Sequence, residues 1–123
     1  MDTPKQRIYI VEDNYDIGFI LELFLNDEGF TVKLLSTAKE FNNALKKGMP
    51  DLFLLDVMLP DGNGIDICHQ LKKDPRSKRL PILIMSAQAN QDAAKNCEAE
   101  EFIAKPFDLS ILLRKIKQYL SAA

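Results

Sequence analysis

Four short apolar runs in this sequence each end in residues that can bind or transfer charged groups. They are followed by Glu12-Asp13, by Asp56, by Ser86 and by Lys105. If the runs are parallel strands of one sheet, their carboxyl ends lie side by side, so three carboxylates, one hydroxyl and one ammonium converge at one edge. Three neighbouring acids raise each other's pKa unless a cation lies between them. The pattern therefore predicts a divalent metal ion with an anion beside Lys105, a combination that suggests phosphoryl chemistry.

The elements that would position these residues alternate along the chain. We expect strands near 7–11, 31–35, 52–55, 81–85 and 102–104, because these runs are short and largely apolar. We expect helices near 14–28, 37–48, 65–73 and 108–120, where apolar residues recur at helical spacing. Asn14 and Thr37 are residue types that cap helix N-termini. The alternation predicts an α/β fold, doubly wound about a five-stranded parallel sheet.

The first expected helix carries apolar residues on two faces. The stripe expected to face the core consists of Ile17, Ile20, Leu21 and Phe24. Phe19 and Leu23 lie four residues apart on the opposite face. Because the core cannot use both faces, part of this helix is left for another role.

Length and composition predict a single domain over residues 1–123, with no second domain that could act as an output. The chain has 46% hydrophobic and 28% charged residues and a net charge of −2, which gives no general reason to expect nucleic acid or an acidic membrane as partner. Its apolar runs are too short to span a bilayer, and its N-terminus lacks a signal-peptide core. Cys68 and Cys97 have no close pairing motif and are expected to be thiols, so we expect a cytoplasmic protein.

One basic run, residues 72–79, is of the kind that contacts nucleic acid in other proteins. It lacks interleaved aromatic residues, and the chain as a whole is acidic. A solvated loop is therefore the favoured interpretation, and no DNA-binding domain is expected in this chain.

Over roughly residues 7–120, the sequence resembles the receiver domain of two-component response regulators. The motifs that carry the resemblance are Glu12-Asp13, the run 54–62, Ser86-Ala87 and Lys105-Pro106-Phe107. Each motif alone is weak, but together, in this order and at strand ends, they are specific. The resemblance implies a flavodoxin-like (β/α)5 fold with strand order 2-1-3-4-5.

The resemblance also implies a role for each acid. Asp56 is expected to accept a phosphoryl group. Mg²⁺ is the expected cofactor: Asp13 would bind it directly, Glu12 mostly through water, and Asp56 and the backbone carbonyl of Met58 would supply further ligands. Hard oxygen ligands of this kind suit Mg²⁺.

Lys105 is expected to pair with the phosphoryl oxygens, and Ser86 to donate a hydrogen bond to them, so that both act with Asp56 in catalysis. Phe102 stands where the family places a switch aromatic, and we expect Ser86 and Phe102 to shift together on phosphorylation. The family also implies a cis bond between Lys105 and Pro106.

The expected phosphoryl donor is a phosphohistidine on a histidine kinase or a histidine phosphotransfer protein. The chain would promote only its own phosphorylation and dephosphorylation and would not turn over free substrates. The first helix of this family docks the donor, so we expect Phe19, Leu23 and Ile17 to contribute to partner docking.

The sequence departs from the family between Ser86 and Lys105, where it is about three residues shorter than usual, close to one helical turn. The segment 88–101 is poor in large apolar residues, so we expect a shortened fourth helix. The acidic stretch 98–101 replaces a usual glycine. These changes affect the face through which members of the family normally contact their output partners, but they leave the expected phosphorylation site untouched.

Other interpretations remain open from the sequence alone. Glu12-Asp13 also suits a helix N-terminus, Ser86 a turn, and Phe102 the core. A small Mg²⁺-dependent phosphohydrolase would use Asp56 as nucleophile, but commonly has a second acid two residues later, where this chain has Met58. A receiver-like binding module would lack one of the acids or the lysine, and none is missing.

Overall fold

The computed structural model describes residues 5–87 and 97–120. Its main sheet has five parallel strands in the order β2-β1-β3-β6-β7. The strands are β1 (Arg7–Val11), β2 (Thr31–Leu35), β3 (Leu52–Asp56), β6 (Ile82–Ser86) and β7 (Glu101–Ala104). Counted without the short strands β4 and β5, this is the predicted order 2-1-3-4-5.

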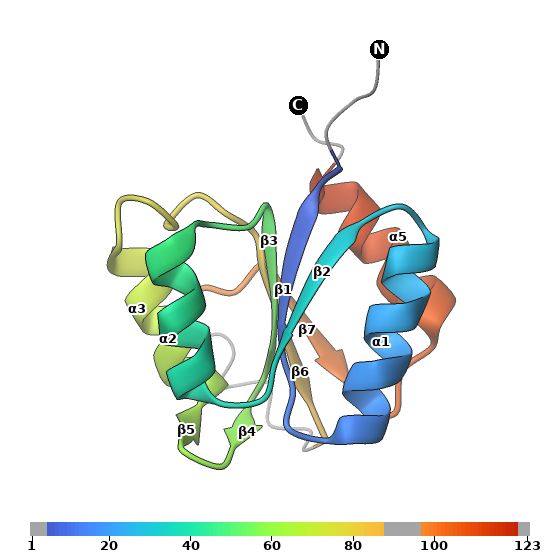
Figure 1. The fold of residues 1–123 in the computed structure, drawn as a ribbon, viewed down its shortest axis with the longest axis horizontal. Helices are drawn as coiled ribbons and strands as arrows, with labels where there is room; N and C mark the ends of the chain where they lie inside the picture. Colours follow the sequence, from blue (N-terminus) through green and yellow to red (C-terminus); the bar gives the residue numbers. More distant parts are fainter. Residues whose placement is uncertain (1–4, 88–96, 121–123) are drawn as a thin grey trace.

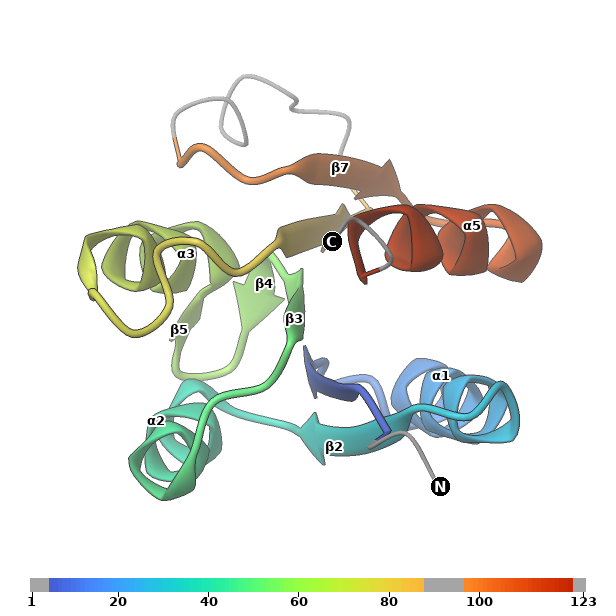
Figure 2. The ribbon, with the colours of Figure 1, turned by 90° about the horizontal axis from the view of Figure 1, so that it is seen from above.

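Helices cover both faces of the sheet. They are α1 (Tyr15–Asp27), α2 (Ala38–Lys47), α3 (Gly64–Lys73) and α5 (Leu109–Leu120). Figures 1 and 2 show α1 and α5 on one face and α2 and α3 on the other. The doubly wound prediction is therefore confirmed. The predicted shortening of a fourth helix falls mainly on residues 88–96, which lie outside the described residues.

Both predicted N-caps form. The side chain of Asn14 accepts a hydrogen bond from the amide of Ile17 at 3.1 Å, and the hydroxyl of Thr37 accepts one from the amide of Glu40 at 3.1 Å. Each bond satisfies an amide that has no acceptor within its own helix. The caps fix where α1 and α2 begin, and α1 begins directly beside the carboxyl end of β1.

The core consists of two layers, one on each side of the sheet. Under α2 and α3, Phe53 meets Tyr9 and Phe41 edge-on, with ring centroids 6.3 and 5.7 Å apart. Under α1 and α5, aliphatic side chains such as Leu21 and Leu112 are completely buried. Because β3 is buried along its whole length, its last residue is held firmly at the edge of the sheet.

The prediction for the buried face of α1 was partly wrong. Ile20 is 50% exposed, whereas Leu25 is completely buried together with Leu21. The buried stripe consists of Gly18, Leu21 and Leu25, and a Cβ at Gly18 would lie only 3.0 Å from the methyl groups of Leu34. Since glycine contributes no apolar signal, the pattern of large residues placed the buried face about one position away.

The segment predicted as a loop after β3 contains a small antiparallel hairpin, formed by β4 (Met58–Leu59) and β5 (Gly62–Asn63). It leads directly into α3. None of the helices in the described ranges has the length and apolar character needed to cross a bilayer.

Candidate functional site

The predicted chemical residues meet at the carboxyl edge of the sheet. Glu12 follows β1, Asp56 ends β3, Ser86 ends β6 and Lys105 follows β7, and these four strands are consecutive in the sheet. A cavity of about 480 Å³ lies at this edge, and Glu12, Asp13, Asp56, Met58 and Lys105 are among the residues that line it. Residues from distant parts of the chain therefore share one pocket.

Lys105 joins two of the acids. Its Nζ lies 2.5 Å from Oε1 of Glu12 and 3.0 Å from Oδ2 of Asp56. The lysine backbone is held in turn, because its amide donates to the carbonyl of Ser86 at 2.8 Å. The bond to Pro106 is cis, as the family resemblance implied. One ammonium group thus bridges the ends of β1 and β3.

The site holds more negative than positive charge away from water. Glu12 is 2% exposed and Asp56 is 5% exposed. Burial, followed by a shared hydrogen bond with Asp56, raises the pKa of Glu12 to about 7, although Lys105 and the amide of Asn14 act in the opposite direction. Burial would lower the pKa of Lys105, but its two carboxylate partners outweigh burial and raise it, so the ammonium group stays charged.

The donor set fits a divalent cation. One carboxylate oxygen from each of Glu12, Asp13 and Asp56 can be chosen so that all three lie within 4.8 Å of one another. All are hard oxygen ligands, which Mg²⁺ prefers. The buried carboxyl groups of Glu12 and Asp56 share one ammonium group, that of Lys105, and the carboxyl group of Asp13 lies beside them. The three acidic residues are called the acid cluster below.

The predicted switch residues lie on neighbouring strands. Ser86 is buried and pairs in register with Ala104, while Phe102 pairs with Ile84, two positions farther from the site edge. Phe102 is half-buried and packs against the core layer under α2 and α3. The structure brings Ser86 to the acid cluster's edge of the sheet, with Phe102 one strand away.

The predicted docking residues lie in different places. Ile17 lines the acid-cluster cavity, whereas Phe19 and Leu23 are 48% and 61% exposed on the outer side of α1. The face of α1 that is exposed and apolar also includes Tyr15, whose ring stacks on Phe19 with centroids 6.1 Å apart, and the unexpected Ile20. We call Tyr15, Phe19, Ile20 and Leu23 the outer face of α1.

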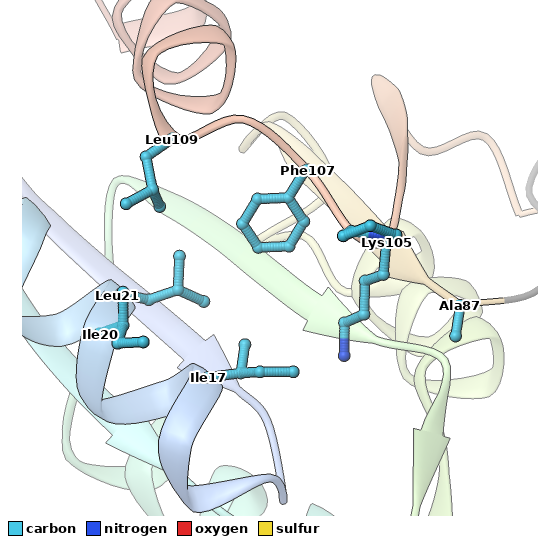
Figure 3. Close-up of a pocket in the computed structure, with 8 residues that line it drawn as sticks. Ile17, Ile20, Leu21, Ala87, Lys105, Phe107 and Leu109 are labelled. Carbon is cyan, nitrogen blue, oxygen red and sulfur yellow. The ribbon is translucent and has the colours of Figure 1, made fainter.

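A second cavity of about 480 Å³ was not expected from the sequence. It lies between α1 and the segment that joins β7 to α5, and Ile17, Ile20, Phe107 and Leu109 are among its lining residues (Figure 3). Figure 3 also shows the side chain of Lys105 at its edge. Phe107 belongs to the Lys105-Pro106-Phe107 motif, but the sequence contains no signal that brings it opposite α1. The cavity places apolar surface directly beside the charged site.

Comparison with known proteins agrees with this architecture. The family model described as the response regulator receiver domain matches residues 8–117. The DNA-binding response regulator MtrA of Mycobacterium tuberculosis is 34% identical over 123 residues, which cover 98% of this chain and 53% of MtrA. The chain thus spans about half the length of the curated relatives it matches.

Solved structures show the same similarity. The receiver domain of a signal transduction histidine kinase from Syntrophus aciditrophicus superposes with a TM-score of 0.90 at 26% identity, covering 96% of this chain and 92% of that one. The receiver domain of a sensor histidine kinase from Pseudomonas aeruginosa gives a TM-score of 0.86 at 25% identity, covering 97% and 100%. The latter was solved with a magnesium ion coordinated in its active-site cleft.

Proposed function

This chain belongs to the response regulator receiver domain family, whose members are phosphorylation-dependent switches, and we propose that Asp56 is the residue that accepts its phosphoryl group. The observation that supports this assignment is the contact between Asp56 and Lys105, 3.0 Å apart within the acid-cluster cavity. Asp56 also ends a completely buried strand, so its carboxylate has a fixed position.

Charge explains how the transfer would proceed. An oxygen of Asp56 attacks the phosphorus of a phosphohistidine, the new O–P bond forms, and the P–N bond to the donor imidazole breaks. The ammonium of Lys105 lies beside the attacking carboxylate, where it offsets the repulsion between two anionic groups. Because Lys105 is already held there, little reorganisation is needed when the donor arrives.

Mg²⁺ is the cofactor of this family, and we propose that Glu12, Asp13, Asp56 and the backbone carbonyl of Met58 hold it in this chain. When bound, the ion supplies further positive charge to the phosphoryl oxygens. The closeness of the three carboxyl groups of the acid cluster supports this assignment.

The proposed switch involves Ser86 and Phe102. A phosphoryl group on Asp56 accepts a hydrogen bond from the Ser86 hydroxyl, and the accompanying shift favours a different packing of Phe102. Phosphorylation then changes the populations of two states because it makes better contacts in one of them. The burial of Ser86 and the half-buried position of Phe102 on the adjacent strand support this proposal.

The chain would promote its own phosphorylation and dephosphorylation only. The phosphohydrolase alternative receives no support from the comparisons, in which the matching family and the similar structures are receiver domains. The position where such hydrolases commonly have a second acid is occupied by Met58.

The proposed donor is a phosphohistidine on a histidine kinase or a histidine phosphotransfer protein. Ile17 lines both the charged pocket and the apolar cavity beside it, so a donor helix seated there would contact both (Figure 3). Phe19 and Leu23 would extend this docking surface along α1. Residues 1–123 would form one receiver unit. We propose a cytoplasmic location for it, since two cysteines without a close pairing motif are typical of a reducing compartment.

Incubation with acetyl phosphate and Mg²⁺, followed by intact mass measurement, tests the assignment of Asp56. The wild-type protein should gain one phosphoryl group, and Asp56→Asn should gain none. Asp66→Asn, which changes an exposed acid in the first turn of α3, is the matched control and should be modified normally. A phosphoryl group on Asp56→Asn would refute the assignment.

A further inference from the structure

The hairpin that follows Asp56 is fixed at its base. The amide of Gly64 donates to the carbonyl of Val57 at 2.9 Å, closing the hairpin directly after β3. Gly64 also lies so close to the phosphorylation site that a Cβ there would be 2.1 Å from the carbonyl oxygen of Asp56. Asn63 caps α3 from the same place. The base of the hairpin is therefore fixed relative to Asp56 and to the start of α3.

The tip of the hairpin is fixed to a different helix. Oδ1 of Asp61 accepts from the amide of Ala38 at 2.7 Å, and Oδ2 accepts from the amide of Lys39 at 3.0 Å. With Thr37, which binds the amide of Glu40, Asp61 satisfies the first three amides of α2. The bonds from these amides, first that of Ala38, lower the pKa of Asp61, so its carboxylate is charged at neutral pH.

Met58 lies between these two anchors. Its amide is 3.4 Å from Oδ1 of Asp56, and it lines the acid-cluster cavity. In the hairpin it pairs with Asn63, next to the base, while Asp61 holds the turn. Without the tip contact, the strand that carries Met58 would be held at one end only. The position of the Met58 backbone relative to Asp56 therefore depends on both anchors.

We propose that Asp61 is a positioning residue for the phosphorylation site: by tying the β4–β5 hairpin to the N-terminus of α2, it fixes the backbone of Met58 relative to Asp56. This inference rests on the proposed function, because Met58 matters there as a carbonyl ligand of Mg²⁺. Mg²⁺ requires near-ideal octahedral geometry, so a displaced carbonyl weakens binding. Residues that orient metal ligands from outside the site commonly change metal affinity by about 10–100-fold when they are replaced.

The test compares two caps of the same helix. Asp61→Ala removes the hairpin contact, whereas Thr37→Ala removes a cap of α2 without touching the hairpin. Mg²⁺ affinity is measured by titration of the full chain. The NMR signal of the Met58 backbone amide reports the position of that backbone. The rate of phosphorylation by acetyl phosphate is the third measurement. Asp61→Ala should weaken Mg²⁺ binding by about tenfold, slow phosphorylation and shift the Met58 amide. Thr37→Ala should leave all three close to wild type.

Asp61→Asn retains one acceptor oxygen for the amide of Ala38, so it should lose less Mg²⁺ affinity than Asp61→Ala. If Asp61→Ala does not fold, Asp61→Asn replaces it in the same measurements. Equal losses in Asp61→Ala and Thr37→Ala would overturn the proposal, because the cause would then be the stability of α2. Wild-type affinity in Asp61→Ala would also overturn it while leaving the proposed function intact. A wild-type protein that neither binds Mg²⁺ nor gains a phosphoryl group would overturn both.

Discussion

Lys105 is the positive charge that lets two acids remain buried at the edge of the sheet. Its ammonium contacts both Glu12 and Asp56, which would otherwise repel each other with little water to screen them. Asp13 is exposed and adds a third negative charge to the same cluster. The arrangement is useful for binding a cation, but the excess negative charge destabilises the fold when no cation is bound.

Replacing Asp13 should therefore weaken metal binding without lowering the stability of the metal-free protein. Without Mg²⁺, Asp13→Asn should be at least as stable as wild type, because one repulsive charge is gone. Saturating Mg²⁺, at about a hundred times its Kd, should stabilise wild type by about 2.7 kcal/mol but leave Asp13→Asn nearly unchanged. Thermal unfolding with and without MgCl₂ measures both effects.

Asp16→Asn is the control for this experiment, because Asp16 is an exposed acid in the first turn of α1 outside the acid cluster. It should respond to Mg²⁺ as the wild-type protein does. Undiminished stabilisation of Asp13→Asn by Mg²⁺ would exclude Asp13 as a ligand.

Residues at strand ends were predictable, whereas residues that act through loops were not. The convergence of Asp56 and Lys105 follows from parallel topology, since it places all carboxyl ends at one edge. The contact of Asp61 with Ala38 joins residues 23 positions apart through a turn whose geometry has no periodic signal. In α1, the buried face begins at Gly18, which carries no apolar side chain to mark it, and Ile20 was assigned to the core instead.

At the scale of elements, acidic side chains tie the start of β7 to its neighbours. Glu100 accepts from Lys72 of α3 at 2.6 and 2.8 Å, and from the amide of Ile82 at 3.0 Å. Glu101 binds Lys115 and the hydroxyl of Tyr119, both in α5. The acidic stretch 98–101 therefore holds the edge strand β7 between α3 and α5 through Glu100 and Glu101.

Glu101 should make this attachment sensitive to acid. Its hydrogen bond with Lys115 is the main cause that lowers the pKa of Glu101 below its ordinary value of 4.5, against the effect of burial. Because the folded-state pKa is lower than the unfolded one, the stabilisation is complete above pH 4.5 and is lost as the pH falls through the folded value. Urea unfolding between pH 6 and pH 3 should show a smaller loss of stability in Glu101→Gln than in wild type.

Glu98→Gln provides the comparison, because Glu98 lies in the same acidic stretch and is exposed. This variant removes an equal charge from the stretch but keeps the contact between Glu101 and Lys115. An unchanged pH dependence in Glu101→Gln would mean that the contact with Lys115 does not contribute to folding.

At the scale of the whole molecule, the charged site and the apolar surfaces of α1 lie next to each other. Ile17 lines both the acid-cluster cavity and the apolar cavity, and Ile20 continues the latter toward the outer face of α1 (Figure 3). Under the proposed function, the charged pocket would react with a small phosphodonor without contacts from these surfaces. The proposed protein donor, in contrast, would have to bring its phosphohistidine to Asp56 while its own surface packs beside the pocket.

This difference separates the two kinds of donor experimentally. Phe19→Ser combined with Leu23→Ser should slow transfer from the cognate phosphohistidine protein by about tenfold or more, because two exposed apolar contacts are lost. Phosphorylation by acetyl phosphate should stay at the wild-type rate. Ile111→Ser, which replaces an exposed apolar residue of α5, is the matched control and should leave both rates unchanged. If the double variant loses both activities equally, the damage lies in the site itself, and the outer face of α1 is not a docking surface.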